Sequence, residues 1–293
     1  MKALITGAGG FVGAHLRAHL EVEGDEVLGV DLEVDVTDEG AVRRVLEAFE
    51  PEAIYHLAAL AHVGESWKDP DRYLAVNAGG TSSVLAAVGA VVPEARVLLI
   101  SSSEVYGTVI PAQLPVTETC ELAPVSPYAV SKVAAEEAVR EAVELHRLNA
   151  VVARPFNHIG PGQARSFAVS AFAHRIVEAT RSGGTSLVVG DLSARRDFTD
   201  VRDVVRAYRS LVIAGVTGEA YNVCSGHDVA MAEVVEALLG LVGASLRLEV
   251  DPELLRPIEI PVLCGDLSKI HAATGWAPAI TLTQSLTDVL AAV

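Results

Sequence analysis

The chain has 293 residues, 51% of them hydrophobic, and a formal net charge of −16. This length is sufficient for a large buried core, arranged as one big domain or two closely joined ones. The acidic balance argues against nucleic acid as a partner, and no uninterrupted apolar run reaches the length of a membrane span.

The N-terminus leads from Met1 and Lys2 directly into a strand-like run, which is not the layout of a signal peptide. The three cysteines, Cys120, Cys224 and Cys264, lie far apart in the sequence. Their spacing fits neither a disulfide framework nor a metal cluster. We therefore expect a cytoplasmic protein that binds no metal and has no membrane segment.

The first half of the chain alternates short apolar runs with helix-like stretches. The strand-like runs are "KALIT", "DEVLGVD", "AIYHLAA", "RVLLISSS" and "NAVVARPF", and the helix-like stretches lie near residues 11–22, 38–49, 71–92 and 127–147. Such alternation requires crossover connections between neighbouring strands. It predicts an α/β fold with a parallel sheet covered by helices on both faces.

After Pro155 this rhythm breaks. The sequence predicts a helix near 166–182, a strand at "TSLVVG", a core helix and strand within 200–224, and a closing helix near 282–292. We expect a dinucleotide-binding domain of residues 1–157, completed by about 197–225. A smaller, discontinuous C-terminal substrate domain would comprise about 158–196 and 226–293.

The first strand-to-helix turn is rich in glycine. "ALITGAGGFVGAHL" places Gly7, Gly10 and Gly13 at this turn, with Phe11 and Val12 opening the helix. Glycines at this spacing let the backbone turn tightly and approach a pyrophosphate, which rests on the helix N-terminus. Because the motif follows a strand and opens a helix, it predicts a Rossmann-type, doubly wound sheet that binds a dinucleotide.

An acidic residue follows at the end of the second strand. Asp31 stands at about the spacing where a carboxylate binds the adenosine ribose hydroxyls. A carboxylate there repels a 2′-phosphate, which favours NAD over NADP. Glu33 or Asp35 could shift this register, and Asp35 with Val36 could instead contact the adenine.

The third strand ends in "HLAA". Leu57, Ala58 and Ala59 are expected beside the pyrophosphate, whereas His56 is expected to be structural. The fourth run ends in "SSSEVYG", where Ser102 and Ser103 precede Glu104. A serine at a strand end can hold a substrate oxygen, and Glu104 is a potential base.

The segment "SPYAVSK" places Tyr128 and Lys132 four residues apart. If Ser126 caps a helix with Pro127 in its first turn, the two side chains share one face. An ammonium beside a phenol favours the phenolate, so we expect a tyrosine pKa below its usual value of about 10. Tyr128 could then act as a general acid or base near neutral pH.

Taken together, these motifs resemble the extended short-chain dehydrogenases/reductases that act on nucleotide sugars. The resemblance implies that Ser102 hydrogen-bonds the substrate oxygen and that Tyr128 transfers the proton. Lys132 would bind the nicotinamide ribose and tune Tyr128, and Asn77 would support the catalytic helix and a proton-relay water. The cofactor site would also include Pro155, from the block "RPFNHIGPGQ".

The second half narrows the resemblance. "FNHIGPGQ", "RDFTDVRDVVRAY", "YNVCSG", "LRPIEIPVLCGD" and "TGWAP" are similar, as a set, to GDP-4-keto-6-deoxy-D-mannose reductases, which make GDP-D-rhamnose. The resemblance implies that Asn157, Arg196 and Arg256 contact the sugar diphosphate, and arginine forks suit phosphate oxygens. Glu259 could bind a ribose or sugar hydroxyl or could be a solvated loop acid.

Three alternatives remain at this stage. A GDP-mannose-type 4,6-dehydratase would use Glu104 as an additional base, although Ser103 stands where one dehydratase group has an aspartate. A 4-epimerase shares part of the block "RDFTDV", and a member of the fold that binds NAD without catalysis usually lacks the serine, tyrosine or lysine.

Related reductases often accept NADPH, so the cofactor is expected to be NAD or NADP. Related enzymes also form homodimers through the helices that correspond to residues 71–92 and 127–147.

Overall fold

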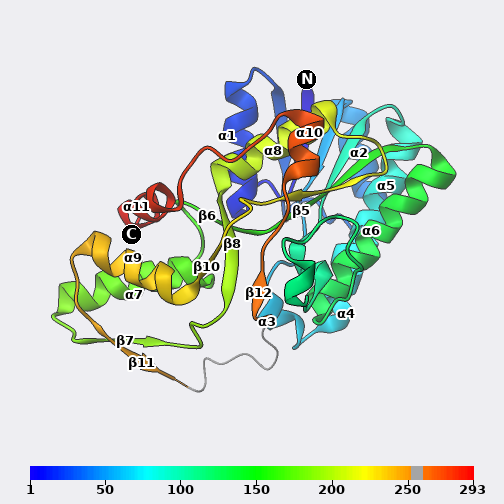
Figure 1. Cartoon of the computed structure of the whole chain (residues 1–293). Coiled ribbons are helices and arrows are strands. Elements are labelled where there is room, and N and C mark those ends of the chain that lie inside the picture. Colours follow the sequence, from blue (N-terminus) through cyan, green and yellow to red (C-terminus); the bar gives the residue numbers. More distant parts are fainter. Residues whose placement is uncertain (252–259) are drawn as a thin grey trace.

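The centre of the molecule is a six-stranded parallel sheet. The computed structural model describes residues 1–251 and 260–293 (Figure 1). The sheet has the order β2-β1-β3-β4-β5-β9. Its strands are β1 (Lys2–Thr6), β2 (Glu26–Val30), β3 (Ala53–His56), β4 (Arg96–Ile100), β5 (Asn149–Pro155) and β9 (Ala220–Val223). The predicted parallel sheet is confirmed, and β1 lies where the strand order reverses, which is the usual ligand crevice of such sheets.

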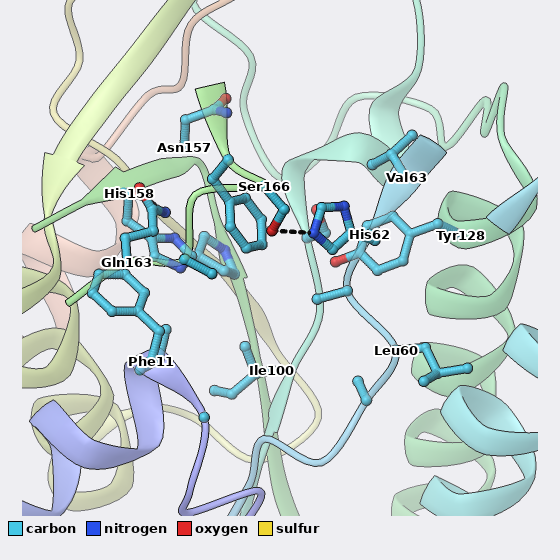
Figure 2. Close-up of a pocket in the computed structure, with 18 of the residues that line it drawn as sticks. Phe11, Leu60, His62, Val63, Ile100, Tyr128, Asn157, His158, Gln163 and Ser166 are labelled. Atoms are coloured by element: carbon cyan, nitrogen blue, oxygen red, sulfur yellow. Dashed lines mark hydrogen bonds between the residues drawn. The ribbon is translucent and has the colours of Figure 1, made fainter. Parts of the chain in front are cut away.

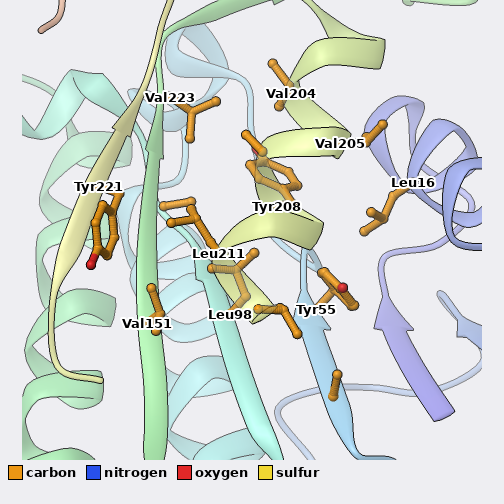
Figure 3. Close-up of a cluster of buried hydrophobic side chains, with 14 of the residues drawn as sticks. Leu16, Tyr55, Leu98, Val151, Val204, Val205, Tyr208, Leu211, Tyr221 and Val223 are labelled. Carbon is orange, nitrogen blue, oxygen red and sulfur yellow. The ribbon is translucent and has the colours of Figure 1, made fainter. Parts of the chain in front are cut away.

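Helices cover both faces of this sheet. One face carries α1 (Phe11–Val22), α8 (Val201–Ala214) and α10 (Ser268–Thr274), and the other carries α2 (Glu39–Phe49), α5 (Gly80–Val91) and α6 (Pro127–His146). Alternate strand residues enter opposite cores, as the strand period of two requires. Ile5 and Tyr55 pack toward α8, whereas Leu4 and Ile54 pack toward α5. Figure 3 shows Tyr55 in the core beside α8. Burial of both faces explains the nearly continuous apolar runs in these strands.

A second hydrophobic core lies beside the sheet, at the lower left of Figure 1. It is formed mainly by α7 (Ala168–Ser182), α9 (Met231–Val242) and α11 (Leu282–Ala291). Two parallel strands, β7 (Ser186–Val189) and β11 (Arg247–Val250), close its lower edge.

A small mixed sheet joins this second core to the central sheet. β8 (Arg195–Asp200) pairs with β6 (Asn157–Ile159), β10 (Asp228–Ala230) and β12 (Val262–Leu263). The buried carboxylate of Asp197 accepts hydrogen bonds from the backbone N–H groups of Ser225, Gly226 and Gly265. It therefore ties β8 to the loops that follow β9 and β12.

The helical segment predicted at 71–92 is interrupted by a wider turn. α4 (Pro70–Leu74) and α5 flank a π-helical turn at Ala75–Gly79, which includes Asn77. The combined segment Pro70–Val91 is long and apolar enough to cross a membrane by length and composition, and its most apolar 18-residue window has a mean hydropathy of 1.5. In this fold α5 packs against α2 and α6, and α4 packs against α6, so part of this apolar surface is covered within the chain.

Three short helical turns complete the described elements. α3 (Val63–Ser66) follows the loop after β3, and 3₁₀ turns lie at Ser103–Tyr106 and Pro111–Gln113. The first 3₁₀ turn begins directly after Ser102, whose Oγ accepts a hydrogen bond from the Glu104 backbone N–H at 3.2 Å. This cap places Ser102 at the carboxyl edge of the sheet, where the predicted site residues converge.

Candidate active site

A cavity of about 1360 Å³ lies along the carboxyl edge of the central sheet and extends to the second core (Figure 2). It brings together nearly all the residues predicted from the sequence. Those that line it are Gly7, Gly10, Phe11, Val12, Gly13, Asp31, Asp35, Val36, Leu57, Ala58, Ala59, Ser102, Ser103, Glu104, Tyr128, Lys132, Pro155, Asn157 and Arg196. Asn77 does not line it, and Arg256 and Glu259 lie outside the described residues.

The glycine-rich turn allows very close backbone packing. Gly7 has a φ of +73°, and a Cβ there would lie 2.8 Å from the Ala58 backbone nitrogen. A Cβ on Gly13 would lie 2.4 Å from the Gly7 carbonyl oxygen. Gly10 caps α1 without a side chain, so the first N–H groups of the helix are available to an anionic ligand. These observations fit a dinucleotide pyrophosphate at this turn.

The acidic residues Asp31, Glu33 and Asp35 after β2 differ in their position relative to the glycine turn and the cavity. Asp31 lies over the glycine turn, since a Cβ on Gly9 would lie 2.0 Å from its Oδ2 atom. Glu33 accepts a hydrogen bond from the Asp31 backbone N–H at 2.8 Å and does not line the cavity. Asp35 lines the cavity while its carboxylate accepts a hydrogen bond from the Thr37 backbone N–H at 2.9 Å. Asp31 is therefore the acid placed nearest the glycine turn.

The first turns of α6 place the predicted catalytic pair. Ser126 Oγ accepts a hydrogen bond from the Ala129 backbone N–H at 3.2 Å, and Pro127 occupies the first turn. Tyr128 and Lys132 are then one helical turn apart, and both are buried. The Lys132 ammonium donates a hydrogen bond to the Ile100 carbonyl at 2.8 Å and lies 6.0 Å from the centroid of the Tyr128 ring.

The expected lowering of the tyrosine pKa is wrong for this structure. Burial raises the pKa of Tyr128 to about 12, and the negative charge of Glu104 adds to this effect, while a hydrogen bond with Ser102 opposes it. Burial also lowers the pKa of Lys132 to about 8, against the opposing charge of Glu136. The phenol is therefore protonated at neutral pH, which suits a proton donor.

Asn77 does not line the cavity but hydrogen-bonds to the segments that form its wall. Its amide binds the Leu60 backbone, accepting from the N–H at 2.8 Å and donating to the carbonyl at 3.1 Å. The same amide donates to Ser131 Oγ at 2.8 Å, and Ser131 donates to the Tyr128 carbonyl at 2.7 Å. The π-helical turn at 75–79 thus connects the loop after β3 to α6.

The two adjacent arginines of β8 lie on opposite sides of the strand. Arg195 forms an ion pair with Asp228, has Glu233 at 3.6 Å, and does not line the cavity. Arg196 is buried and lines the cavity. It therefore places a guanidinium at the second-core side of the cavity, where an anionic ligand group could bind.

A buried ion pair links α6 to β5. Arg154 on β5 pairs with Glu136 on α6, with Nη2 and Oε2 2.6 Å apart, and both side chains are buried. Glu136 lies one helical turn after Lys132 and accepts a hydrogen bond from Ser101 Oγ, next to Ser102. Arg154 also donates to the Tyr106 hydroxyl at 3.0 Å. The pair thus joins α6 to the ends of β4 and β5.

Several lining residues were missed by the sequence analysis. His62 hydrogen-bonds with Ser166 at 2.7 Å, and its ring lies 4.7 Å from that of Phe167, so the loop after β3 contacts the segment before α7 (Figure 2). Other missed lining residues are Arg72, Arg165, Arg175 and Tyr208. His62 could have been found because "AHVGES" continues from the end of the third strand, at the edge where the other candidates lie.

Comparison with known proteins identifies the family. A family model described as GDP-mannose 4,6 dehydratase matches residues 31–289. The chain belongs to this dehydratase family. The GDP-6-deoxy-D-mannose reductase of Pseudomonas aeruginosa is 38% identical over 292 residues, which cover 99% of this chain and 96% of that enzyme. The resemblance to extended short-chain dehydrogenases/reductases of nucleotide sugars is thus confirmed.

Two solved structures extend the comparison within and beyond the GDP-sugar enzymes. RMD from Pseudomonas aeruginosa, complexed with NADPH, has a TM-score of 0.91 at 37% identity, with 99% of this chain and 98% of that chain covered. The UDP-glucose 4-epimerase of Thermus thermophilus, complexed with NAD, has a TM-score of 0.90 at 27% identity, covering 100% and 98%. The dehydratase-family fold therefore occurs in enzymes that bind either dinucleotide.

Proposed function

We propose that this dehydratase-family protein is a nucleotide-sugar reductase. It would reduce the 4-keto group of a GDP-4-keto-6-deoxyhexose with NADH or NADPH, giving a GDP-6-deoxyhexose such as GDP-D-rhamnose. The observation that carries the proposal is the similarity to a GDP-6-deoxy-D-mannose reductase over nearly the whole of both chains. The protonated, buried Tyr128 supports it, because reduction requires a proton donor at the new alkoxide.

The residues of the cavity can perform this reaction in defined roles. Bound NAD(P)H supplies the hydride, and the glycine turn with Asp31 would hold its adenosine and pyrophosphate. Tyr128 donates a proton to the forming hydroxyl, while the Ser102 hydroxyl stabilises the developing negative charge. Arg196, with Arg256 and Asn157, would bind the diphosphate and so orient the sugar. Glu259, which lies outside the described residues, would contact a ribose or sugar hydroxyl or remain a solvated loop acid.

A 4,6-dehydratase is the second candidate. The family model and the position of Glu104, whose charge acts on Tyr128, favour it. The two activities are separated by supplying either GDP-mannose with oxidised cofactor or the 4-keto sugar with reduced cofactor. A reductase turns over only the second mixture and consumes the cofactor. Formation of a keto sugar from GDP-mannose without net cofactor consumption would establish the dehydratase instead.

The nucleotide base is tested independently of the chemistry. We expect GDP to raise the melting temperature of the protein more than UDP or dTDP at the same concentration, because specific binding stabilises the folded state. A clear preference for a nucleotide other than GDP would contradict the substrate part of the proposal.

Lys132 should make cofactor binding depend on pH. Its ammonium would bind the nicotinamide ribose, and its pKa of about 8 means that this charge is present below pH 8 and lost above it. We expect the affinity for NAD(P)H to fall severalfold as the pH rises from 7 to 9, because a neutral amine forms a weaker hydrogen bond than an ammonium. Titration across this range should show little such dependence in Lys132→Met, and an equal dependence there would contradict the assignment.

Asp31 should favour NADH over NADPH. A carboxylate beside the glycine turn repels a 2′-phosphate, and Asp35 also lines the cavity. We expect Asp31→Asn to shift the ratio of kcat/KM values toward NADPH by about tenfold, which corresponds to ~1.4 kcal/mol of lost repulsion. Steady-state kinetics with both cofactors measures this ratio. The idea fails if the wild type prefers NADPH and the substitution leaves the ratio unchanged.

We also propose that the protein is cytoplasmic and forms a homodimer through the surfaces of α5 and α6. Only 39% of the most apolar window of Pro70–Val91 is buried within one chain. Val130 and Leu145 of α6 are 47% and 68% exposed. A second copy of the chain would cover these apolar groups. A strictly monomeric mass at micromolar concentration would contradict the dimer.

A further inference from the structure

Tyr208 has a buried hydroxyl that the structure leaves unpaired. Its side chain extends from α8 into the core formed with Leu16, Leu98 and Val151 (Figure 3). The residue is 0% exposed, and its hydroxyl has no hydrogen-bond partner among the described residues. Because an unpaired buried hydroxyl is unfavourable, such a group in a native core calls for an explanation.

The same residue forms part of the cavity wall. Among the described residues of α8, Tyr208 alone lines the cavity. The helix packs against β4 and β5, whereas the cavity lies at the carboxyl edge of the sheet. Tyr208 is therefore the described residue of α8 that borders the cavity, with its hydroxyl buried beneath the cavity wall.

The part of the cavity next to Tyr208 is the cofactor side. Val12 of the glycine turn and Ile100 at the end of β4 pack against the core that contains Tyr208, and both line the cavity. Burial raises the pKa of Tyr208, and Tyr128 adds to this effect, so the Tyr208 hydroxyl is protonated at neutral pH. Arg196, by contrast, belongs to the second-core side of the cavity.

We propose that the Tyr208 hydroxyl forms a hydrogen bond to the nicotinamide end of the bound dinucleotide. Tyr208 would thereby help to set the position of the nicotinamide relative to Tyr128. The inference rests on the cofactor use in the proposed function. It adds a cofactor-binding residue that the glycine motif and the tyrosine–lysine pair do not predict.

Tyr55 provides a matched control in the same core. Its hydroxyl is also buried without a hydrogen-bond partner among the described residues, and the residue is likewise 0% exposed. Tyr55 does not line the cavity. Tyr55→Phe and Tyr208→Phe therefore remove the same unpaired group from the same core, and only the second removes it from the proposed site.

The test is titration of the purified, cofactor-free protein with NADH and NADPH, using calorimetry or cofactor fluorescence to obtain Kd. We expect Tyr208→Phe to weaken binding about three- to tenfold, the effect of one neutral hydrogen bond, and Tyr55→Phe to leave Kd unchanged. Neither variant should lower the melting temperature of the free protein, because each removes an unpaired hydroxyl. ADP-ribose, which lacks the nicotinamide, should bind Tyr208→Phe as tightly as the wild type.

The other possible results of these titrations contradict either the role of Tyr208 or the proposed function. Wild-type affinity of Tyr208→Phe for the dinucleotides would overturn the inference and leave the proposed function standing. An equal loss of affinity for ADP-ribose would overturn the nicotinamide placement. Failure of the wild type to bind NADH or NADPH would contradict the proposed function itself, and this inference with it.

Discussion

Replacing Tyr128 by phenylalanine is expected to lower kcat by at least about 10²–10⁴-fold, the usual contribution of a positioned general acid. The buried phenol is protonated at neutral pH and has Ser102 as its hydrogen-bond partner. Removal of the hydroxyl leaves the new alkoxide without its proton donor. The ring itself is retained, so we expect the Kd values for nucleotide sugar and cofactor to change little.

Tyr73 offers a control for this substitution. Its ring lies 6.4 Å from that of Tyr128 in an edge-on arrangement, and its hydroxyl donates to the His62 carbonyl at 2.7 Å. Tyr73 does not line the cavity. Tyr73→Phe should therefore retain most of the activity under the same assay. If Tyr128→Phe also retains most of it, Tyr128 is not the proton donor.

Breaking the buried Arg154–Glu136 pair should have the largest effect on stability. Arg154→Met leaves the Glu136 carboxylate buried without its main partner, which typically costs about 3–5 kcal/mol of the free energy of unfolding. The lost contacts also include the hydrogen bond from Arg154 to Tyr106. Urea denaturation monitored by circular dichroism measures the change.

Arg140, an exposed arginine of the helix that carries Glu136, is the matched control. Arg140 pairs with Glu137 and Glu144, and all three side chains are more than half exposed. Solvent screens such pairs, so Arg140→Met should change the free energy of unfolding by less than about 1 kcal/mol. The double substitution Arg154→Met, Glu136→Leu should recover part of the stability by removing the unpaired charge. Equal effects of Arg154→Met and Arg140→Met would refute a special role for the buried pair.

The central sheet could be predicted because its signals are local. The five apolar runs of the first half and the glycine turn follow directly from burial and backbone requirements, and α1 begins and ends at the predicted residues, Phe11 and Val22. The small sheet around β8 was not predicted. β10 and β12 have only three and two residues, too few for a periodic pattern, and their pairing with β8 depends on contacts distant in the sequence.

Side chains that follow strand ends or share a helix face, as Ser102, Tyr128 and Lys132 do, could be grouped from the sequence, and all three line one cavity. The pKa of Tyr128 was predicted in the wrong direction because burial is a tertiary property. Spacing placed the ammonium near the phenol, whereas the structure directs that ammonium to the Ile100 carbonyl. Tyr208 was missed for a similar reason, since nothing in "VVRAYRS" indicates that this residue borders a cavity.

The most direct test of the proposed reduction is the transfer of deuterium from the nicotinamide C4 of labelled NADH or NADPH to the sugar. The enzyme is incubated with the GDP-4-keto-6-deoxyhexose and the labelled cofactor, and the product is analysed by NMR and mass spectrometry. We expect one deuterium at C4 of the sugar for each cofactor oxidised. Absence of label in the sugar, together with conversion of GDP-mannose to the keto sugar by the same protein, would contradict reduction and establish dehydration.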